Sequence, residues 1–240
     1  TPFDSKSAET LQRMNVDAFK IGSGDLTYFP LLKQIAGYKK PIILSTGMST
    51  LGEIERALDR ICETDPMSEV ALLHCTSSYP APFESLNLKA IQTLQTVFGR
   101  PVGYSDHSKG IEAPIAAAAV GAQILEKHFT LSRSMEGPDH QASLEPHELK
   151  MMANAVFNAC AALGKPIKRI VSQEKGTREK VRRSIYIARD LTSGHVMEES
   201  DLLYLRPLSG VEASEYEQVI GRRLVRSKRR QDPLYWKDLD

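Results

Sequence analysis

The chain has 240 residues, of which 41% are hydrophobic and 25% charged, and its 31 basic and 30 acidic side chains leave a net charge of +1. This composition is typical of a globular protein and excludes intrinsic disorder. With so small a net charge, no long-range field draws the chain to nucleic acid or to an anionic membrane, so we expect neither as a partner.

Three cysteines, Cys62, Cys75 and Cys160, lie far apart in the sequence. They form neither a disulfide framework nor a Cys-x-x-Cys metal site, which favours a reducing compartment and makes the cytoplasm the expected location. The longest apolar stretch, residues 111–124, is interrupted by polar residues and is shorter than the roughly 20 residues that span a bilayer. We therefore expect no membrane span and no signal peptide.

Five short apolar runs follow one another between residues 17 and 130, and each leads through a small polar cluster into a longer amphipathic stretch. Apolar runs that alternate with helical patterns predict buried parallel strands in βα units. The predicted strands are residues 18–21, 41–44, 70–73, 101–104 and 122–125. The chain has no Gly-x-Gly-x-x-Gly motif that would favour a doubly wound sheet, so the pattern favours part of a (β/α)₈ TIM barrel.

The alternation of apolar runs and amphipathic stretches ends after the last of these units. An amphipathic helix is predicted from Pro146 to Gly164, followed by a basic segment, residues 165–183, that we interpret as an irregular linker. Residues 184–240 open with an apolar run and are enough for a small, marginally stable domain that docks on another part. We therefore divide the chain into a barrel part, residues 1–164, the linker, and a small C-terminal domain.

Histidines stand at the ends of two consecutive predicted strands, His107 and His128, with Asp106 and Glu126 beside them. Adjacent parallel strands lie about 4.8 Å apart, so two side chains that leave the same end of a sheet can share one ion. Two imidazoles with oxygen neighbours suit a transition metal such as Mn²⁺, Zn²⁺ or Fe²⁺ better than a hydrated Mg²⁺. Alternatively, each histidine is a hydrogen-bonded core or rim residue. The residues leave both interpretations open.

Small hydroxyl side chains and one lysine lie at the same level of the predicted barrel. A lysine within an apolar strand needs an anionic partner, and hydroxyls with loop N–H groups hold phosphates or carboxylates at a barrel mouth. The pattern predicts an anion site, although small residues also simply end strands. The members are Thr1, Lys20, Ser23, Ser45, Thr46, Ser77, Ser78 and Ser105.

Three further features are weaker. Cys75 follows His74, but neighbours on a strand point to opposite faces, so a packed thiol is expected rather than a nucleophile. The loop of residues 137–140 either places Asp139 over the site or forms an Asx-type turn. Six Lys or Arg residues among positions 221–230 are interpreted as a solvated strand face rather than a nucleic-acid site.

Seven motifs carry a resemblance to a known family: residues 1–4 (TPFD), 20–24 (KIGSG), 43–48 (ILSTGM), 72–80 (LLHCTSSYP), 103–107 (GYSDH), 126–129 (EKHF) and 137–140 (GPDH). In this order and spacing they resemble the N-acetylneuraminate (sialic acid) synthase family, including the legionaminic and pseudaminic acid synthases. Residues 182–186 (RRSIY) resemble the start of the antifreeze-like (SAF) domain that follows the barrel in that family. The resemblance covers essentially the whole chain.

The resemblance implies an enzyme that condenses phosphoenolpyruvate with an N-acylated amino sugar such as N-acetylmannosamine and releases phosphate by C–O cleavage. It implies Mn²⁺, with Mg²⁺ or Co²⁺ as other candidates, held by His107 and His128. Phosphoenolpyruvate would bind Thr1, Lys20, Ser23, Ser45, Ser77 and Ser105.

The catalytic residues implied by the resemblance are Asp25, Tyr79 and Asp139. Tyr79 and Asp139 would also contact the amino sugar, together with Arg206 of the SAF domain. Arg206 resembles an arginine that enters the site of the partner subunit, which implies a homodimer that is domain-swapped through the SAF domain.

Two positions depart from the family pattern: Asp25 stands where the family commonly has glutamate, and Gln231 where it commonly has glycine. The family's first three strands would precede Thr1, so the chain is expected to hold the end of the third strand and the fourth to eighth strands. A barrel cannot close on five strands without exposing two edges. We therefore expect residues 1–240 alone to be inactive and poorly soluble.

Two other functions remain compatible with the residues. A metal-dependent aldolase or lyase on the same barrel would use free pyruvate as its donor. A non-catalytic carbohydrate-binding protein would keep its ligand when both histidines are replaced. The sequence does not decide which nonulosonic acid a synthase of this kind would make.

Overall fold

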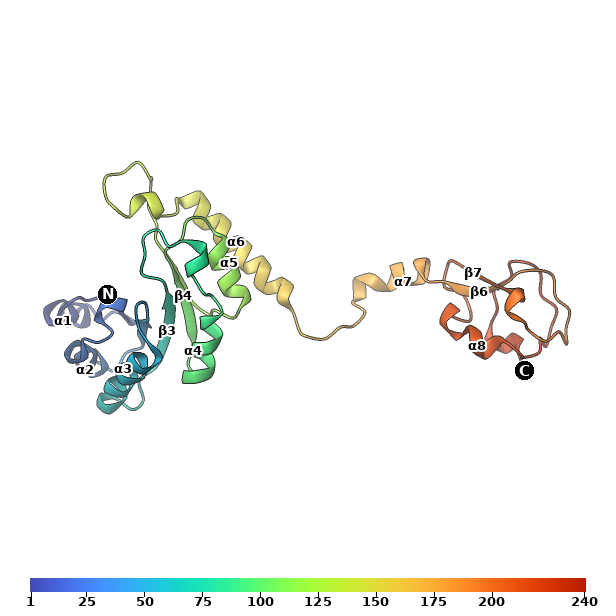
Figure 1. Ribbon diagram of the computed structural model, residues 1–240, viewed down its shortest axis with the longest axis horizontal. Helices are drawn as coiled ribbons and strands as arrows, with labels where there is room; N and C mark the ends of the chain where they lie inside the picture. The colour runs from blue at the N-terminus through green and yellow to red at the C-terminus, as the bar shows by residue number, and fades with distance from the viewer. The chain divides into compact units, whose positions relative to one another are not determined.

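The computed structural model describes residues 1–240 as two compact units, Thr1–Lys165 and Pro166–Asp240 (Figure 1). The first unit holds a curled five-stranded sheet in the order β1-β2-β3-β4-β5, and every neighbouring pair is parallel. This arrangement confirms the predicted part of an α/β barrel. The strands are β1 Phe19–Ile21, β2 Ile42–Ser45, β3 Val70–Cys75, β4 Val102–Asp106 and β5 Leu125–Lys127.

Helices connect the strands and cover one face of the sheet. The helix α3 begins with a capping box in which Thr50 and Glu53 bond each other's backbone N–H groups. The α-helices of this unit are α1 Ser5–Arg13, α2 Phe29–Ala36, α3 Leu51–Thr64, α4 Ala90–Phe98, α5 Glu112–Ala119 and α6 Pro146–Leu163, and its 3₁₀ turns are η1 Ser23–Asp25, η2 Phe83–Ser85 and η3 His140–Ala142. None of the helices combines the length and apolar character that a bilayer crossing requires.

The two faces of the sheet differ in chemistry because side chains alternate along each strand. Apolar side chains such as Ile21, Leu44 and Leu72 are buried in the core between the sheet and the helices. The alternate positions carry polar groups, and the register places Cys75, Ser105 and Glu126 side by side on β3, β4 and β5. Strands β2, β3 and β4 run one or two residues further than the apolar runs indicate, because backbone pairing continues into the polar clusters.

The second unit contains the antiparallel pair β6 Ser184–Ile187 and β7 Leu202–Leu205, with short bridges to the segments around them. Its core is apolar and includes Ile185, Ile187, Met197, Val211 and Leu234. The helices and turns are α7 Lys175–Val181, α8 Tyr216–Val219, η4 Ser172–Glu174, η5 Glu199–Asp201, η6 Ala213–Glu215 and η7 Trp236–Asp238.

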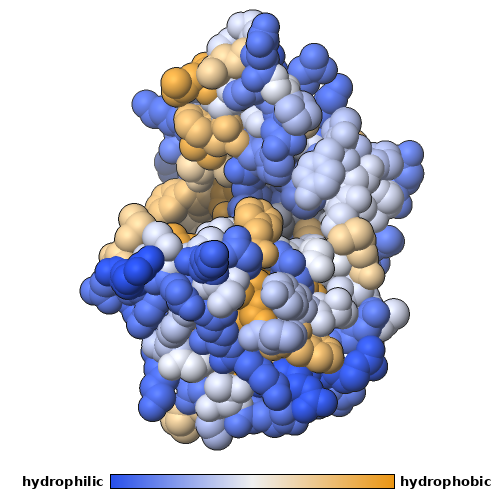
Figure 2. All heavy atoms as spheres, turned by 90° about the vertical axis from the view of Figure 1, so that its left-hand side faces the viewer, coloured by the Kyte–Doolittle hydropathy of each residue, from blue (hydrophilic) through white to orange (hydrophobic).

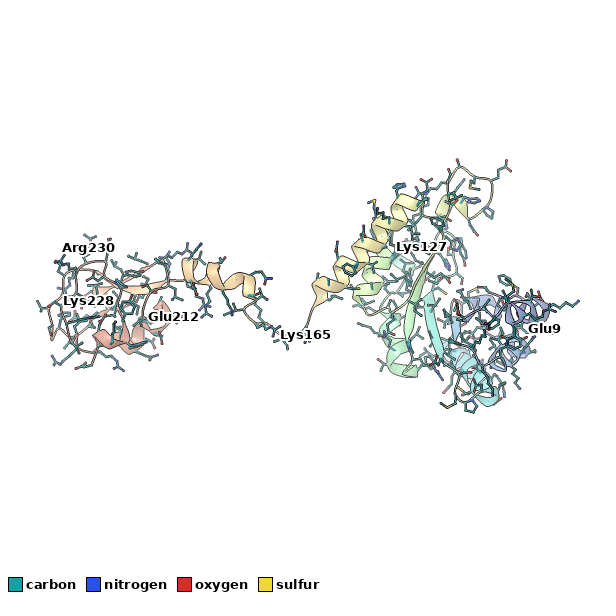
Figure 3. All side chains as sticks on the ribbon, turned by 180° about the vertical axis from the view of Figure 1, so that it is seen from behind. Glu9, Lys127, Lys165, Glu212, Lys228 and Arg230 are labelled. Carbon is teal, nitrogen blue, oxygen red and sulfur yellow. The ribbon has the colours of Figure 1, made fainter.

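The segment interpreted as an irregular linker contains the helix α7, which the sequence pattern missed because its residues show no apolar periodicity. Arg178 on this helix and Arg182, the residue after its end, form ion pairs of 3.4 and 3.2 Å with Glu212 (labelled in Figure 3). Elsewhere in the unit Gln231 has a φ of 66°, which lies in the left-handed region that glycine adopts most easily. The predicted substitution of glutamine for the family's glycine therefore falls at a backbone position where glycine would be unstrained.

A carboxyl group with no solvent exposure lies within the second unit. Asp201 accepts hydrogen bonds from Arg189 Nε at 2.9 Å, His195 Nε2 at 2.7 Å and the Glu198 N–H at 3.0 Å. Burial by itself would raise the pKa of Asp201, but the hydrogen bonds from these partners outweigh it, so the pKa lies below its ordinary value. The folded unit therefore favours the charged carboxylate.

We expect the second unit to lose stability in acid. A carboxyl group whose pKa is lower when folded stabilises the fold above its unfolded pKa of about 3.9 and loses that contribution as the pH falls through the folded pKa. The variant Asp201→Asn should lose about 2 kcal/mol at neutral pH and show a shallower decline below about pH 4. Trp236 is the single tryptophan and lies in this unit, so its fluorescence during urea unfolding measures the effect. An identical pH dependence in both proteins would contradict the expectation.

Candidate active site

A cavity of about 860 Å³ lies at the carboxyl ends of the five strands. The first unit is hollowed on the face that Figure 2 presents, and hydrophobic side chains gather in that hollow. Nearly all the residues singled out from the sequence line the cavity, although they come from five βα units. They are Thr1, Lys20, Ser23, Asp25, Ser45, Ser77, Tyr79, Ser105, His107 and His128.

Lys20 has the anionic partner that its position in an apolar strand requires. Its Nζ lies 3.4 Å from Oε1 of Glu126, and the same oxygen accepts a hydrogen bond of 2.7 Å from the hydroxyl of Ser105. Sequence reasoning placed Glu126 beside the histidines and missed its pairing with Lys20. The ammonium group of Lys20, the carboxylate of Glu126 and the hydroxyl of Ser105 therefore lie together at the cavity.

The hydroxyl of Ser45 is buried and has no hydrogen-bond partner. The residue is 2% exposed and lines the cavity, so its unused hydrogen-bonding capacity is available there. A buried polar group without a partner costs about 1–3 kcal/mol. An oxygen atom of a bound anion would accept a hydrogen bond from Ser45 and remove this cost, so we expect the hydroxyl of Ser45 to bind a ligand.

The loops after β1, β2 and β3 approach one another closely at Gly47. The N–H of Gly47 donates to the hydroxyl of Ser23 at 3.0 Å, and that hydroxyl lies 3.1 Å from the thiol of Cys75. A Cβ atom at position 47 would stand 2.4 Å from the hydroxyl of Ser77. A side chain at position 47 would displace the hydroxyls of Ser77 and Ser23, so the glycine leaves room for both of them. The sequence did not indicate that Cys75 belongs to the site. Cys75 is the last residue of β3, and its side chain lines the cavity.

The two histidines lie next to each other at the ends of β4 and β5. Their ring centroids are 5.3 Å apart with the rings edge to face, and Nδ1 of His107 lies 2.8 Å from the carbonyl oxygen of Thr76. Burial lowers the pKa of His107, which favours the neutral ring. A neutral ring that donates from Nδ1 to this carbonyl presents the lone pair of Nε2, which is the form that binds metals.

Tyr79 packs against both histidines, with ring centroids 4.2 Å from His107 and 5.6 Å from His128. Burial raises the pKa of Tyr79, and the nearby acidic groups Cys75, Asp139 and Glu126 raise it further. The phenol therefore remains protonated and can donate a hydrogen bond into the cavity.

The remaining predicted residues lie at the edge of the site or outside it. Asp139 is outside the cavity lining, but its carboxylate is 3.9 Å from Nδ1 of His128. Thr46 turns away to bond the carbonyl of Leu73, and the hydroxyl of Ser78 bonds that of Pro80. Arg206 is exposed and belongs to the second unit.

The expectation that Asp106 would stand beside a metal is wrong. Asp106 does not line the cavity, and its side chain forms an ion pair with Lys127. The reason is the alternation of strand residues, which sends Ser105 and His107 to one face and Asp106 to the other. No group of three His, Cys, Asp or Glu side chains converges as a complete metal site. The donor set fits a metal held by two imidazoles whose other ligands are water or substrate oxygens.

Comparison with known proteins agrees with the geometry. The chain matches the NeuB family over residues 1–168 and the SAF domain over residues 182–240. The N,N'-diacetyllegionaminic acid synthase of Campylobacter jejuni is 46% identical over 223 residues, which are 92% of this chain and 67% of that protein. The synthase of the same name from Legionella pneumophila is 41% identical over 243 residues, 100% of this chain and 68% of that protein.

A solved structure is similar in sequence and in fold. It is the N-acetylneuraminic acid (sialic acid) synthetase from Leptospira borgpetersenii in complex with citrate, with a TM-score of 0.68 and 39% identity. The match covers 73% of this chain and 61% of that one, so the chain spans less than two thirds of the solved relative. The half-barrel, the C-terminal domain and these relatives agree, and the chain belongs to the NeuB family.

Proposed function

We propose that the chain is the part of a nonulosonic acid synthase that binds phosphoenolpyruvate and an N-acylated amino sugar and joins them. The observation that carries the proposal is that one cavity brings together a cation with an unpartnered hydroxyl and a pair of imidazoles. Lys20 and Ser45, here called the donor wall, supply the first, and His107 and His128 supply the second. An anionic donor bound at the donor wall and an aldehyde acceptor bound at the histidines lie next to each other.

The donor wall suits a small molecule with several negative oxygens. Lys20 neutralises charge, Ser45 supplies its free hydroxyl, and Ser23 and Ser77 lie close together beside Gly47. Hydrogen bonds to charged oxygens are about twice as strong as those between neutral groups, so several such contacts fix the orientation of the donor. Thr1 and Ser105 complete the set of residues proposed to bind phosphoenolpyruvate.

The reaction forms one C–C bond and one C–O bond and breaks the C–O bond to phosphate. The methylene carbon of phosphoenolpyruvate bonds to the aldehyde carbon of the amino sugar, and the aldehyde oxygen takes up a proton. The oxygen of a water molecule bonds to the second carbon of the donor, and one water proton replaces the proton that the aldehyde oxygen took up. The bond from that carbon to the phosphate oxygen then breaks, the carbon becomes a ketone, and the second water proton leaves with inorganic phosphate. Asp25 lines the cavity and Tyr79 is a protonated phenol, so we assign them the handling of water and protons, with Asp139 placed against the sugar.

His107 and His128 are the residues that would hold a divalent metal, Mn²⁺ in the first place. A metal bound there would act as a Lewis acid on the aldehyde oxygen. The carbonyl of Thr76 fixes the ring of His107, and the ring of Tyr79 covers it. The chain itself thus supplies the orientation that such a site needs.

The proposal is tested by a screen for phosphate release. The protein, expressed from its complete gene, is incubated with Mn²⁺, phosphoenolpyruvate and a panel of N-acyl amino sugars, and we expect release of inorganic phosphate that depends on the sugar. Condensation with pyruvate in place of phosphoenolpyruvate would favour an aldolase or lyase and contradict the proposal. Residues 1–240 alone are expected to be inactive, because β1 and β5 each pair with a single strand and leave two open edges.

We further propose that Arg206 contacts the N-acyl group of the sugar in the site of a partner subunit. Arg206 is exposed at the end of β7 and forms no ion pair within its own unit. Its guanidinium is therefore free to bind a carbonyl oxygen. The arrangement requires a homodimer that exchanges its SAF domains.

Mixing two inactive variants tests the exchange. In a mixed dimer of Arg206→Ala and His107→Ala, one cavity receives an intact arginine from the other subunit. An equal mixture that has exchanged subunits should recover about a quarter of the wild-type activity, because half of the dimers are mixed and each has one intact site. Each variant alone serves as the control. No recovery in a mixture with demonstrated subunit exchange would show that Arg206 does not act across the dimer.

A further inference from the structure

An ion pair joins the ends of β4 and β5. Nζ of Lys127 (labelled in Figure 3) lies 2.5 Å from Oδ2 of Asp106. The two side chains are 2% and 0% exposed, so the pair is buried. Lys127 borders the cavity, but its ammonium group ends at Asp106 and not in the cavity.

Asp106 is the centre of a hydrogen-bond network. Its Oδ1 accepts bonds from the hydroxyl of Tyr104 at 3.0 Å and from the N–H and hydroxyl of Ser108 at 2.9 and 2.7 Å. Burial raises the pKa of Tyr104, which keeps its phenol protonated and a donor. Lys127 also donates to the carbonyl of Ser108. The network therefore ties the chain before and after His107 to β5.

The pair stands between the groups that form the site. Asp106 lies between Ser105 and His107 in the sequence, and Lys127 lies between Glu126 and His128. Asp106 and Lys127 are also directly opposite each other, at the last rung of the pairing between β4 and β5. Fixing this rung consequently fixes the relative positions of both histidines.

The strand β5 needs such a restraint, because it has three residues and pairs with β4 alone. A slip of one residue would turn Glu126 and His128 away from the cavity. A slip of two would keep their face but move His128 by about 6.6 Å along the strand. Either slip would separate Lys127 from Asp106 and leave both charges buried without partners, so the ion pair opposes both.

We propose that Asp106 and Lys127 form a positioning pair that sets the separation of His107 and His128 and thereby the metal affinity of the site. The inference rests on the proposed function, since it takes the two histidines to be metal ligands. Neither residue touches the metal or the substrates. Both act through the strand ends that carry the histidines.

The test replaces both charges at once. A buried ion pair can be removed without loss of folding when no charge is left unpaired, so the double variant Asp106→Asn with Lys127→Met is used, in which the amide oxygen of asparagine still accepts the hydrogen bonds from Tyr104 and Ser108. Titration with Mn²⁺, followed by electron paramagnetic resonance of the free ion, should show an affinity about 10- to 100-fold weaker than that of the wild type. In the metal-free protein, the nuclear Overhauser contact between the rings of His107 and His128 should weaken. The conservative single variant Lys127→Arg keeps the positive charge beside Asp106 and should therefore retain most of the wild-type Mn²⁺ affinity.

Lys228→Met is the matched control, because Lys228 also forms a buried ion pair with an aspartate, Asp238, at 2.5 Å in the second unit. It should lower stability and leave the Mn²⁺ affinity unchanged. A folded double variant with wild-type affinity would overturn the inference. If the double variant does not fold, Asp106→Glu keeps the charge and adds a methylene group, and an affinity within twofold of the wild type would overturn the inference equally.

The same titration distinguishes failure of the metal site from failure of the positioning pair. Loss of Mn²⁺ binding in His107→Ala supports the metal site, and an unchanged affinity in that variant overturns the proposed ligands and this inference with them. Loss in His107→Ala together with an unchanged affinity in the pair variants overturns the inference alone.

Discussion

Replacing either His107 or His128 with alanine is expected to lower turnover about a thousandfold or more. Each variant removes one of the two imidazoles at the ends of β4 and β5, and the remaining ring cannot hold a metal by itself. A bound metal supplies several kcal/mol of stabilisation to charge that develops on an oxygen, and each 1.36 kcal/mol is a factor of about ten in rate. Phosphate release by the full-length variants measures the loss.

Binding measurements on the same variants separate metal from donor. Mn²⁺ affinity should fall together with turnover, whereas the affinity for phosphoenolpyruvate should change less, because its proposed contacts Lys20 and Ser45 are unaltered in these variants. His147→Ala is a suitable control, since His147 is on the exposed surface of α6. If both histidine variants kept the affinity for the amino sugar and the wild type showed no turnover, the chain would be a carbohydrate-binding protein.

The architecture of the first unit follows from the sequence because parallel strands buried in a barrel are continuous apolar runs. The runs that end at Ile21, Leu44 and Leu73 are unmistakable, and the polar residue types that follow them mark the carboxyl ends. Since all carboxyl ends of a parallel sheet meet at one edge, the sequence alone assigns residues from five units to one cavity.

The roles of Asp106, Glu126 and Lys127 could not be assigned in the same way. Adjacent residues on a strand point to opposite faces, so the assignment depends on which residue of each strand faces the cavity. The strand β5 begins only at Leu125, the last residue of the apolar run, and its pairing register with β4 is a tertiary property. Only the register shows that Asp106 meets Lys127 while Ser105 meets Glu126.

The second unit was harder to predict because its helix α7 is polar and short. Arg178 and Arg182 are held by Glu212, a residue about thirty positions away along the chain. Contacts of this kind leave no periodic signal in the sequence, since charged residues on a surface helix vary freely in spacing. The core of the unit, by contrast, is predicted by the apolar run that includes Ile185 and Ile187.

Replacing Lys20 with methionine is expected to lower kcat/KM for phosphoenolpyruvate by about 100- to 1,000-fold, mainly through KM. Methionine keeps the length of the side chain and removes its charge, so the donor loses the cation that neutralises it. The change also leaves Glu126 without its partner, 3.4 Å away in the wild type, and the unpaired carboxylate repels an anion in the cavity.

The repulsion by Glu126 makes the prediction specific to the ion pair of Lys20 and Glu126. If Glu126 repels the donor once Lys20 is gone, then Glu126→Gln in the Lys20→Met background should recover part of the lost affinity, because glutamine removes the charge and keeps an oxygen that accepts the hydrogen bond from Ser105. Steady-state kinetics with phosphoenolpyruvate and calorimetric titration with inorganic phosphate give the two readouts. Mn²⁺ affinity should fall far less than phosphate affinity, because Lys20 is not a proposed metal ligand and is linked to His107 only through Glu126 and Ser105. An unchanged KM in Lys20→Met would place the donor elsewhere in the cavity, and the assignment of Ser23, Ser45 and Ser77 would fall with it.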